Sequence, residues 1–326
     1  MKYRAVAMQR PGGPEVLALV ELERQRPAAG QVLLRQLAAG VNYIDVQHRT
    51  GRYPIARYPA VIGMEAVGMV EEVGTGVTEC KPGDRVAYST PPAGAYAEWR
   101  VMPSHRLVPV PASLDDALAG GSFLRGLTAQ YLVKRTFPVA SGHAIVVHAA
   151  AGGVGQILCQ WAKYLGATVI GTVGSEQKVA LARECGCDLV LVNGRDDVPA
   201  RVREATAGAG ADVVYDSIGP ATFEASLASL KSRGLLVTFG TASGPLPPLD
   251  LFRLNQMGSL FVTSAGLFDY TKERKELLER ASDYFDALAR GIVRVAVQHR
   301  YRLGEAAQAH AELQGRRTTG PIVLIP

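Results

Sequence analysis

The chain has 326 residues, a length that suggests two domains, and its 48% hydrophobic and 20% charged residues are typical of a soluble globular protein. The formal net charge is +5, and the basic residues are scattered rather than clustered, so the sequence does not indicate a nucleic-acid-binding protein. No apolar run is long enough to span a membrane and no signal peptide follows Met1, so we expect neither a membrane segment nor export.

The four cysteines do not follow the pattern of a disulfide framework. Cys185 and Cys187 are separated by one residue, a spacing that matches neither a zinc knuckle nor a redox Cys-x-x-Cys motif, and the other two are Cys80 and Cys159. Because disulfides are rare in reducing compartments, this cysteine usage leads us to expect a cytoplasmic protein.

The first 124 residues read as an all-β domain whose short strands are separated by turns rich in Gly and Pro. One helical turn is expected in the segment from Ala39 to Pro54. Short strands at this spacing are typical of a partly open barrel. The strands are expected within Tyr3–Met8, Val16–Val20, Gln31–Leu37, Val61–Gly74, Lys81–Tyr88 and Gly94–Arg100.

From His143 to about residue 265, apolar strands alternate with helices, which is the pattern of a doubly wound α/β domain. A helix from Leu114 to Leu132 precedes this domain, and a charged amphipathic helix from Thr271 to Arg290 follows it. We therefore predict an α/β protein with a β domain at 1–124, completed by 266–326, and a nucleotide-binding domain at 125–265. Its strands are expected at His143–His148, Gly166–Val173, Leu189–Val192, Ala211–Asp216, Gly234–Phe239 and Ser259–Thr263.

A glycine-rich turn lies between the first strand and the first helix of this second domain. Gly152, Gly153 and Gly155 carry no Cβ, so a pyrophosphate can approach the N–H groups and the positive dipole end of the following helix. The spacing departs from a strict Gly-x-Gly-x-x-Gly motif, and glycines needed only for close helix–strand packing remain an alternative. The surrounding strand, helix and second strand favour a dinucleotide site.

The end of the second strand indicates which dinucleotide is bound. An NAD site usually has Asp or Glu there, to hold the ribose 2′-hydroxyl, and this strand instead ends at Gly174-Ser175. Ser175 and Lys178, three residues apart at a helix start, are suited to a 2′-phosphate, so the sequence favours NADPH. Glu176 would oppose the phosphate if it turned inward. In the alternative reading, Ser175 only caps a helix and Lys178 is only a solvated charge.

Several motifs together resemble the zinc-free quinone oxidoreductases, the zeta-crystallin-like branch of the medium-chain dehydrogenase/reductase superfamily. The resemblance covers essentially the whole chain, and it implies a GroES-like catalytic domain, a Rossmann domain, NADPH as the cofactor, and a homodimer joined at the sheet edge near residues 259–268. It rests on the glycine turn and on Gly40–Asp45, Arg49–Pro54, Gly83–Val86, Phe123–Thr128, Gly171–Ser175, Phe239–Gly240 and Thr318–Pro326.

The resemblance also implies the roles of individual residues. Asn42 and Asp45 are expected near the nicotinamide, and Tyr53 near the acceptor, although a half-buried aromatic with no role in chemistry is an equal alternative for Tyr53. The expected cofactor contacts are Asn42, Tyr131, Gly152, Gly153, Val154, Gly174, Ser175, Lys178, Asn193, Ser217, Phe239, Gly240, Ser243 and Arg316. Arg317 is an alternative to its neighbour Arg316. Two positions depart from the family pattern: Asn193-Gly194 replaces an Asn-Tyr pair expected near the adenine, and Gln47 replaces an aromatic residue.

Zinc alcohol dehydrogenases share this fold, so a metal is the main competing chemistry. By resemblance, Met64 stands where they have a histidine ligand and Asn42 where they have a cysteine ligand. A thioether and a carboxamide are poor zinc ligands, and the four cysteines of a structural zinc site are missing, so we expect no metal.

We therefore predict an enzyme that reduces quinones by hydride transfer from NADPH, without a metal. One alternative is the reduction of an activated C=C bond, which needs a proton donor, and Tyr53 is the only obvious candidate. A second alternative is an NADPH-binding protein with a mainly RNA-binding or structural role, but the sequence has no basic cluster with interleaved aromatics.

Overall fold

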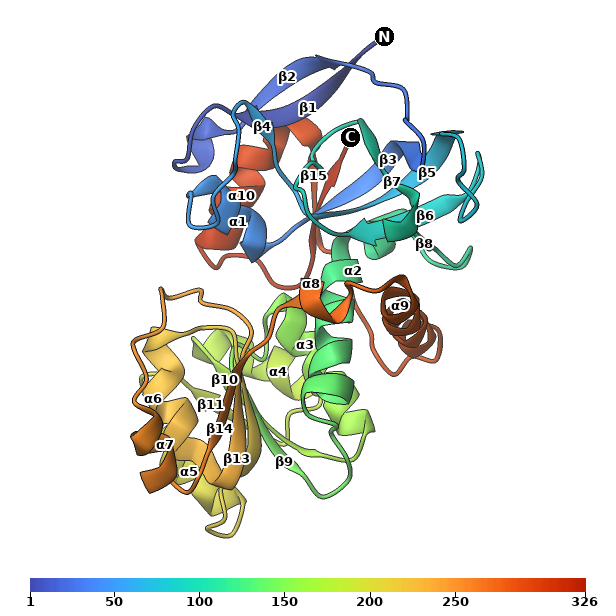
Figure 1. Cartoon of the computed structure of the whole chain (residues 1–326). Coiled ribbons are helices and arrows are strands. Elements are labelled where there is room, and N and C mark those ends of the chain that lie inside the picture. The colour runs from blue at the N-terminus through green and yellow to red at the C-terminus, as the bar shows by residue number, and fades with distance from the viewer. The chain divides into compact units, whose positions relative to one another are not determined.

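The computed structural model describes all residues from Met1 to Pro326, which form two compact units (Figure 1). The first consists of Met1–Leu124, Thr271–Ala281 and Val295–Pro326, and the second of Arg125–Tyr270 and Ser282–Arg294. The unit boundaries fall inside helix α2 (Asp116–Tyr131) and helix α9 (Arg274–Ala289). Within 266–326, therefore, residues 266–270 and 282–294 group with the second unit and the others with the first.

The first unit is built from two sheets. The small sheet has the order β2-β1-β4, and the large sheet has the order β15-β16-β3-β5-β6-β8 with β7 paired to β3. Long strand β3 contributes buried Val32, Leu34, Ala39 and Val41 to the core between them. The strands are β1 (Lys2–Met8), β2 (Ala18–Glu23), β3 (Gln31–Val41), β4 (Ala60–Val61), β5 (Glu65–Val73), β6 (Arg85–Ser89), β7 (Trp99–Pro103), β8 (Val108–Pro109), β15 (His299–Arg302) and β16 (Ile322–Ile325).

Two expected strands of this unit begin later than predicted. The segment Val16–Val20 starts inside a 3-10 turn (Pro14–Val16), because Pro14 fixes a helical φ at the first position, and β2 begins at Ala18. The strand expected at Gly94–Arg100 begins at Trp99. Residues before it pair irregularly, since the Tyr96 N–H donates to the Ile62 carbonyl at 2.9 Å and Ala97 forms a single bridge with Ala5.

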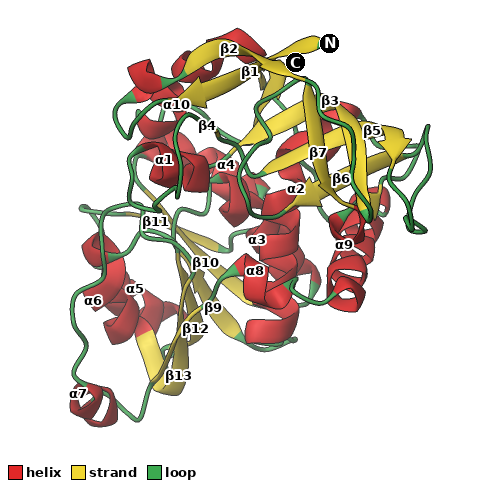
Figure 2. Ribbon diagram, turned by 45° about the horizontal axis from the view of Figure 1, so that its top comes forward, coloured by secondary structure: helices red, strands yellow, loops and turns green.

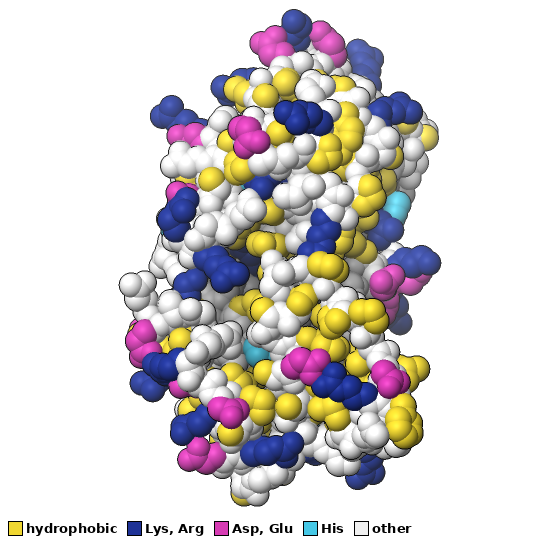
Figure 3. Space-filling model, turned by 90° about the vertical axis from the view of Figure 1, so that its left-hand side faces the viewer, with side chains coloured by type: hydrophobic (Ala, Val, Ile, Leu, Met, Phe, Trp, Pro, Cys, Tyr) yellow, Lys and Arg dark blue, Asp and Glu magenta, His cyan; other side chains and the backbone are white.

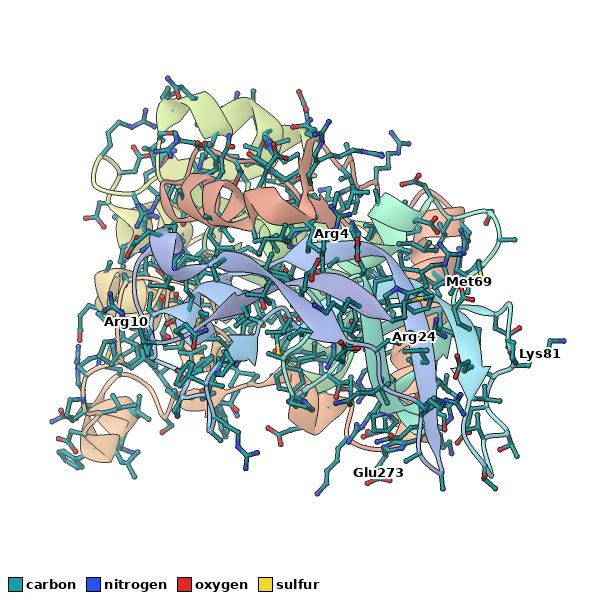
Figure 4. All side chains as sticks on the ribbon, turned by 90° about the horizontal axis from the view of Figure 1, so that it is seen from above. Arg4, Arg10, Arg24, Met69, Lys81 and Glu273 are labelled. Atoms are coloured by element: carbon teal, nitrogen blue, oxygen red, sulfur yellow. The ribbon has the colours of Figure 1, made fainter.

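Ion pairs on the outer side of this unit tie its strands together. Arg4 on β1, labelled in Figure 4, donates from Nε to Glu98 at 2.7 Å. Arg24, also labelled there, lies with its guanidinium 4.3 Å from the ring centroid of Trp99 on β7, and it pairs with Glu72 on β5. These contacts connect β1 and the end of β2 to strands of the large sheet, although exposed pairs of this kind contribute little stability each.

The second unit is a parallel six-stranded sheet with the order β11-β10-β9-β12-β13-β14. This order has its switch point between β9 and β12, as in doubly wound nucleotide-binding folds, so the prediction for this domain is confirmed. Figures 1 and 2 show α3 and α4 on one face of the sheet and α5, α6 and α7 on the other. The strands are β9 (Ala144–Val147), β10 (Thr168–Val173), β11 (Leu189–Val192), β12 (Ala211–Asp216), β13 (Leu230–Thr238) and β14 (Phe261–Ser264).

The helices form where the sequence alternates with these strands. Along α3, Ile157, Leu158, Trp161 and Ala162 recur at helical spacing and are all buried. The helices of both units are α1 (Tyr43–Arg49), α2, α3 (Gly153–Tyr164), α4 (Val179–Glu184), α5 (Val198–Ala205), α6 (Pro220–Ser229), α7 (Leu251–Gln256), α8 (Leu267–Tyr270), α9 and α10 (Ala306–Gln314). The helix expected from Thr271 to Arg290 is α9, which begins three residues later, at Arg274.

The surface carries mixed charge. On the face drawn in Figure 3, lysine and arginine side chains are spread out, with aspartate and glutamate interspersed among them. None of the helices combines the length and the apolar character that crossing a bilayer requires.

Candidate functional site

The N-terminus of α3 lies at the centre of the candidate site in the second unit. Gly152 is its N-cap residue and makes no side-chain capping bond, and the first intrahelical bond there joins the Gln156 N–H to the Gly152 carbonyl at 2.9 Å. The N–H groups of Gly153, Val154 and Gly155 therefore have no acceptor within the protein. Three unsatisfied donors at the positive end of a helix suit the oxygens of a pyrophosphate.

The glycines at this turn have different roles. A Cβ on Gly155 would lie 2.2 Å from the Ala149 carbonyl oxygen. The close packing of the helix on the strand is therefore sufficient to require glycine at this position. A Cβ on Gly153 would lie 2.6 Å from the Nε of Arg125, the end of a flexible side chain. The packing interpretation thus accounts for Gly155, whereas Gly152 and Gly153 leave the backbone donors open. These residues fit a dinucleotide.

A hydroxyl, that of Ser175, and an ammonium group, that of Lys178, follow the end of β10, with Glu176 between them. Ser175 caps the 3-10 turn Glu176–Lys178 through its backbone, and its hydroxyl makes no capping bond. Glu176, which could have opposed a phosphate, is held in an ion pair with Arg195. Arg195 also donates to Asp196 at 2.9 Å. β10 itself therefore carries no carboxylate at its end, where NAD sites have the acid that binds the ribose hydroxyl.

The loops after β12 and β13 are joined to each other. The Ser217 carbonyl accepts from the Ala242 N–H at 3.2 Å, and the Ile218 carbonyl accepts from the Ser243 N–H at 2.7 Å. A Cβ on Gly240 would lie 2.9 Å from the Ser217 carbonyl oxygen, so only glycine permits this approach. The structure thus brings Ser217, Gly240 and Ser243 together, next to Phe239, whose N–H donates to the Asp216 carbonyl at 2.9 Å.

Tyr131, which the resemblance assigns to the cofactor, lies inside the second unit. Its side chain is 1% exposed, its ring stacks on Tyr270 at 4.3 Å, and its hydroxyl donates to the Ala265 carbonyl at 3.2 Å. Burial and the neighbouring Tyr270 raise the pKa of Tyr131 well above its usual value. The Tyr131 hydroxyl is therefore protonated, and its proton is already donated to the Ala265 carbonyl.

In the first unit, Asn42 and Asp45 belong to one buried hydrogen-bonded group at the start of α1. The Asn42 N–H donates to Asp45 Oδ2 at 2.8 Å, and its side-chain amide donates to Glu65 Oε1 at 2.7 Å. Glu65 Oε2 accepts from the Leu124 N–H at 2.6 Å. Asp45 and Glu65 are fully buried and Asn42 is 4% exposed, so these contacts fix the orientation of the Asn42 amide.

The same group extends to the C-terminal part of the chain. The Tyr96 hydroxyl lies 3.1 Å from Asp45 Oδ2 and 3.0 Å from His310 Nε2. Because a carboxylate only accepts, Tyr96 donates to Asp45 and receives from the Nε2–H of His310. Burial, assisted by Arg49, lowers the pKa of His310 to about 3, so the imidazole is neutral at ordinary pH.

The remaining predicted residues of this unit are exposed. Tyr53 is 42% exposed and lies edge-on to the His48 ring at 5.9 Å between centroids. Arg316 is exposed with a left-handed φ of 58°, and Arg317 beside it pairs with Glu312 at 2.8 Å.

The structure contains no group of three or more His, Cys, Asp or Glu side chains placed to hold a metal ion. At the two positions that the resemblance assigns to zinc ligands, Met64 is buried at 1% exposure, and the Asn42 amide nitrogen is committed to Glu65. Neither side chain offers an anionic or imidazole donor.

Sequence reasoning missed the buried polar residues beneath these sites. They are Glu65 in the first unit and His148, Thr172 and Ser226 in the second. The one available signal was Asp216, an acid ending an otherwise apolar strand, since a buried carboxylate must have several donors around it.

Both units resemble known proteins in sequence. The sequence matches the family described as Alcohol dehydrogenase GroES-like domain over residues 28–112, and the family described as Zinc-binding dehydrogenase over residues 153–283. A quinone oxidoreductase of Pseudomonas aeruginosa is 45% identical, over 97% of each chain. A 2-haloacrylate reductase of a Burkholderia species is 43% identical, over 99% of this chain and 98% of its own.

Two solved structures are similar over nearly their whole length. A quinone oxidoreductase of Pseudomonas syringae has a TM-score of 0.97 at 44% identity, and the match covers 99% of this chain and 100% of the other. An Escherichia coli quinone oxidoreductase complexed with NADPH has a TM-score of 0.97 at 41% identity, with the same coverage. The predicted fold class, a GroES-like β domain with a doubly wound α/β domain, is confirmed.

Proposed function

Since the chain belongs to the quinone oxidoreductase family of the medium-chain dehydrogenases/reductases, we propose that it reduces quinones with NADPH, by hydride transfer and without a metal. The observation that carries the proposal is the α3 N-terminus with its three unsatisfied N–H groups, together with Ser175, rather than an acid, just after the end of β10. The similar Escherichia coli structure with NADPH supports the choice of cofactor.

Residues of the second unit would hold the cofactor. The backbone of Gly152, Gly153 and Val154 would bind the pyrophosphate, and Gly174, Ser175 and Lys178 the 2′-phosphate. The remaining proposed contacts in this unit are Tyr131, Asn193, Ser217, Phe239, Gly240 and Ser243. The buried position of Tyr131 restricts it to supporting the site through its backbone and packing.

In the first unit, the proposed cofactor contacts are Asn42 and Arg316. The residues proposed to lie closest to the reaction are Asn42, Asp45 and Tyr53. NADPH, when bound, supplies a hydride. A quinone accepts hydride without metal polarisation, because the charge spreads over the developing phenolate. The side chains of this unit would orient the reactants and donate hydrogen bonds, with Asp45 acting through the Asn42 backbone.

A second candidate reaction is the reduction of an activated C=C bond. It is favoured by the similarity to a 2-haloacrylate reductase at 43% identity over nearly the whole chain. That reaction places a proton on carbon and needs a donor in the site, whereas a hydroquinone oxygen takes its proton from water. Tyr53 is exposed and is the candidate donor in this unit.

The deciding experiment measures NADPH oxidation by metal-free protein with an ortho-quinone, an alkenal, 2-chloroacrylate or no acceptor, and repeats each with NADH. We expect fast quinone turnover with NADPH and little with NADH. Faster turnover of the alkenal or chloroacrylate would replace the quinone reaction by C=C reduction. Tight NADPH binding without oxidation by any acceptor would favour a binding or structural role, which RNA titration at two salt concentrations would then test.

We further propose a homodimer joined through β14, and a cytoplasmic location. β14 is the outer strand of the parallel sheet, and Phe261 on it is 60% exposed, so the edge offers unpaired backbone groups and an apolar side chain. Leu251 and Phe252 on α7 are 75% and 65% exposed. The four unpaired cysteines support a reducing compartment.

A further inference from the structure

Buried polar side chains, with the partly buried Asn193 at one end, form a continuous hydrogen-bonded line in the second unit, beneath the carboxyl ends of four neighbouring strands. Asn193, after β11, lies 3.3 Å through its Nδ2 from the Thr172 hydroxyl on β10, and that hydroxyl lies 2.8 Å from His148 Nδ1, after β9. His148 Nε2 lies 3.0 Å from the Ser226 hydroxyl on α6, which lies 2.8 Å from Asp216 Oδ2 at the end of β12. We call these five residues the relay.

The two ends of the relay fix the direction of every hydrogen bond in it. A carboxylate only accepts, so Ser226 donates to Asp216 and must accept from the Nε2–H of His148. An amide nitrogen only donates, so Thr172 accepts from Asn193 and gives its own proton to His148 Nδ1. The imidazole of His148 is therefore neutral, with its proton on Nε2. Burial lowers the pKa of His148, against the opposing effect of Asp216, which agrees with a neutral ring.

Each end of the relay holds a loop. At one end, Asp216 Oδ1 accepts from the N–H groups of Ile218 at 2.7 Å and Gly219 at 3.1 Å, and Oδ2 also accepts from the Thr222 hydroxyl at 2.8 Å. The carboxylate thus fixes the turn 217–219, where Gly219 has a left-handed φ of 97°. Ser217 in this turn packs against Gly240, so the Asp216 carboxylate also helps to fix the loop after β13.

At the other end, Thr172 engages one N–H of the Asn193 amide. The amide oxygen and the second N–H have no partner within the protein. An amide with one free acceptor and one free donor can pair with an adenine or a ribose edge. The next residue, Gly194, stands where the family pattern leads us to expect a tyrosine, so hydrogen bonding by Asn193 would replace aromatic stacking.

We propose that His148, together with Thr172 and Ser226, is a positioning residue for the dinucleotide: it fixes the Asn193 amide on the adenosine side and the turn 217–219 on the nicotinamide side. This inference rests on the proposed function, because both ends are proposed NADPH contacts. The Nε2–H tautomer of His148 connects the two ends, because in it Nδ1 accepts the Thr172 proton while Nε2–H donates to the Ser226 oxygen, whose own proton goes to Asp216.

A change at one end of the relay should therefore reach the other. In Ser226→Ala, the Nε2–H of His148 loses its acceptor inside the core, and an unsatisfied buried donor is costly. The ring can relieve this by moving its proton to Nδ1, where it donates to the Thr172 oxygen. The Thr172 proton must then leave His148 and take one of the two other positions around its oxygen, one of which the Asn193 amide occupies, so the hold on that amide weakens.

The tautomer is measured directly by long-range proton–nitrogen NMR on protein labelled with 15N-histidine, without ligand. The signal of His148 is identified as the one that moves in both Thr172→Val and Ser226→Ala and stays in place in Ser229→Ala. Ser229 is the matched control, because it is a fully buried serine on the same helix whose hydroxyl donates to the Ala225 carbonyl instead. We expect Nε2–H in the native protein and a shift toward Nδ1–H in Ser226→Ala. An Nδ1–H or doubly protonated ring in the native protein would overturn the relay.

The coupling is measured by equilibrium binding of NADPH and of adenosine 2′,5′-bisphosphate, which lacks the nicotinamide half. We expect Ser226→Ala to raise both dissociation constants about fivefold to tenfold, although Ser226 lies on the other side of His148 from Asn193. Thr172→Val should act similarly, and the double variant should be little weaker than either single variant. Ser229→Ala should stay within about twofold of the native protein. Unchanged bisphosphate binding in Ser226→Ala, or additive effects in the double variant, would refute the proposal.

Failure of the relay and failure of the proposed reaction can be told apart. The tautomer is read on the free protein and the affinities on ligand binding, so neither depends on turnover. A native protein that binds NADPH but reduces no quinone would overturn the proposed reaction and leave these measurements valid. If the native protein reduces quinone but the effects of Ser226→Ala and Thr172→Val on binding are additive, the relay is refuted and the proposed reaction stands.

Discussion

The side-chain amide of Asn42 donates a 2.7 Å hydrogen bond to Glu65, whose carboxylate is fully buried. The second oxygen of Glu65 is held by the Leu124 N–H at 2.6 Å. Because the carboxylate can only accept, it holds the Asn42 amide with its nitrogen turned toward Glu65. Glu65, 23 residues from Asn42 in the sequence, thus determines the orientation of a proposed catalytic residue.

Glu65→Gln tests this arrangement. A glutamine retains one acceptor oxygen for two donors, so either Asn42 or the Leu124 N–H meets an amide NH2 group instead. We expect about 1–3 kcal/mol of lost stability and a fall of about tenfold in kcat/KM, measured by urea unfolding and by steady-state kinetics. In an Asn42→Ala background the same change should have little further effect on kcat/KM. Equal effects in both backgrounds would show that Glu65 does not act through Asn42.

Cofactor choice depends on the end of β10. Ser175→Ala and Lys178→Ala each remove a group suited to the 2′-phosphate, so we expect each to weaken NADPH binding by about tenfold or more and to leave NADH binding unchanged. Isothermal titration with both cofactors measures this. Lys163→Ala on α3 is the control, because Lys163 pairs with Asp188 and lies outside the proposed contacts. A parallel loss of NADH affinity would mean that the two side chains support the fold and do not select the phosphate.

Tyr53→Phe removes one hydroxyl from an exposed side chain. If that hydroxyl donates to a developing phenolate, kcat with a quinone should fall by about tenfold to a hundredfold, with little change in stability. Stopped-flow oxidation of NADPH gives the rate. Tyr164→Phe, a change on another half-exposed tyrosine that bonds to Arg290, should leave turnover as it is. Unchanged turnover in Tyr53→Phe would remove Tyr53 from the mechanism.

His310 makes stability depend on pH. Its pKa is lowered from 6.5 to about 3 in the folded protein, so below pH 6.5 the unfolded chain binds a proton that the folded protein does not. Its contribution to stability is complete above pH 6.5 and is lost as the pH falls toward 3, with about 2 kcal/mol lost at pH 5. Urea unfolding between pH 7.5 and 5 should therefore show a shallower loss in His310→Gln than in the native protein. His105→Gln, at an exposed position of the same unit, should keep the native slope.

The proposed dimer is tested at Phe261. Phe261→Lys places a charge on the outer strand of the parallel sheet, and charged edge residues prevent strand pairing between chains. We expect light scattering after gel filtration to show a dimer for the native protein and a monomer for this variant. Leu19→Lys, at a half-exposed apolar residue on β2 of the first unit, should stay dimeric. A native monomer would exclude the edge as an interface between copies.

The fold of the second unit was predictable because its signals are local. β9 is a continuous apolar run and β10 a mostly apolar one, α3 shows helical periodicity, and the glycine turn lies between β9 and α3, so each element is specified by its own residues. In the first unit the predicted start of β2 was wrong because Pro14 begins a 3-10 turn, a local signal that was overlooked. The predicted start of β7 was wrong because the irregular pairing around Ala97 depends on a partner elsewhere in the chain.

The candidate site was predictable only where backbone geometry determines it. Glycines and the residue that ends a strand can be read from spacing, but the relay joins five residues from separate elements that share no sequence pattern. Glu65 is similar: nothing around it in the sequence indicates that its carboxylate meets Asn42, since β3 and β5 must first pair to bring them together. Such contacts are products of the tertiary structure.

The stack of Tyr131 on Tyr270 has a consequence for the order in which the protein assembles. These two rings lie near the entry and the exit of the long stretch of chain that builds the second unit. Strand β16 must find β3, with Ile322 opposite Val41, and an unfolded chain would have to close a very long loop to do so. Once the second unit has folded and this stack has formed, the residues between the two tyrosines are compact and their ends are held close together. The effective loop between β3 and β16 is then much shorter. We therefore expect the second unit to mature first and to serve as a template that brings the early and late parts of the first unit within reach of each other.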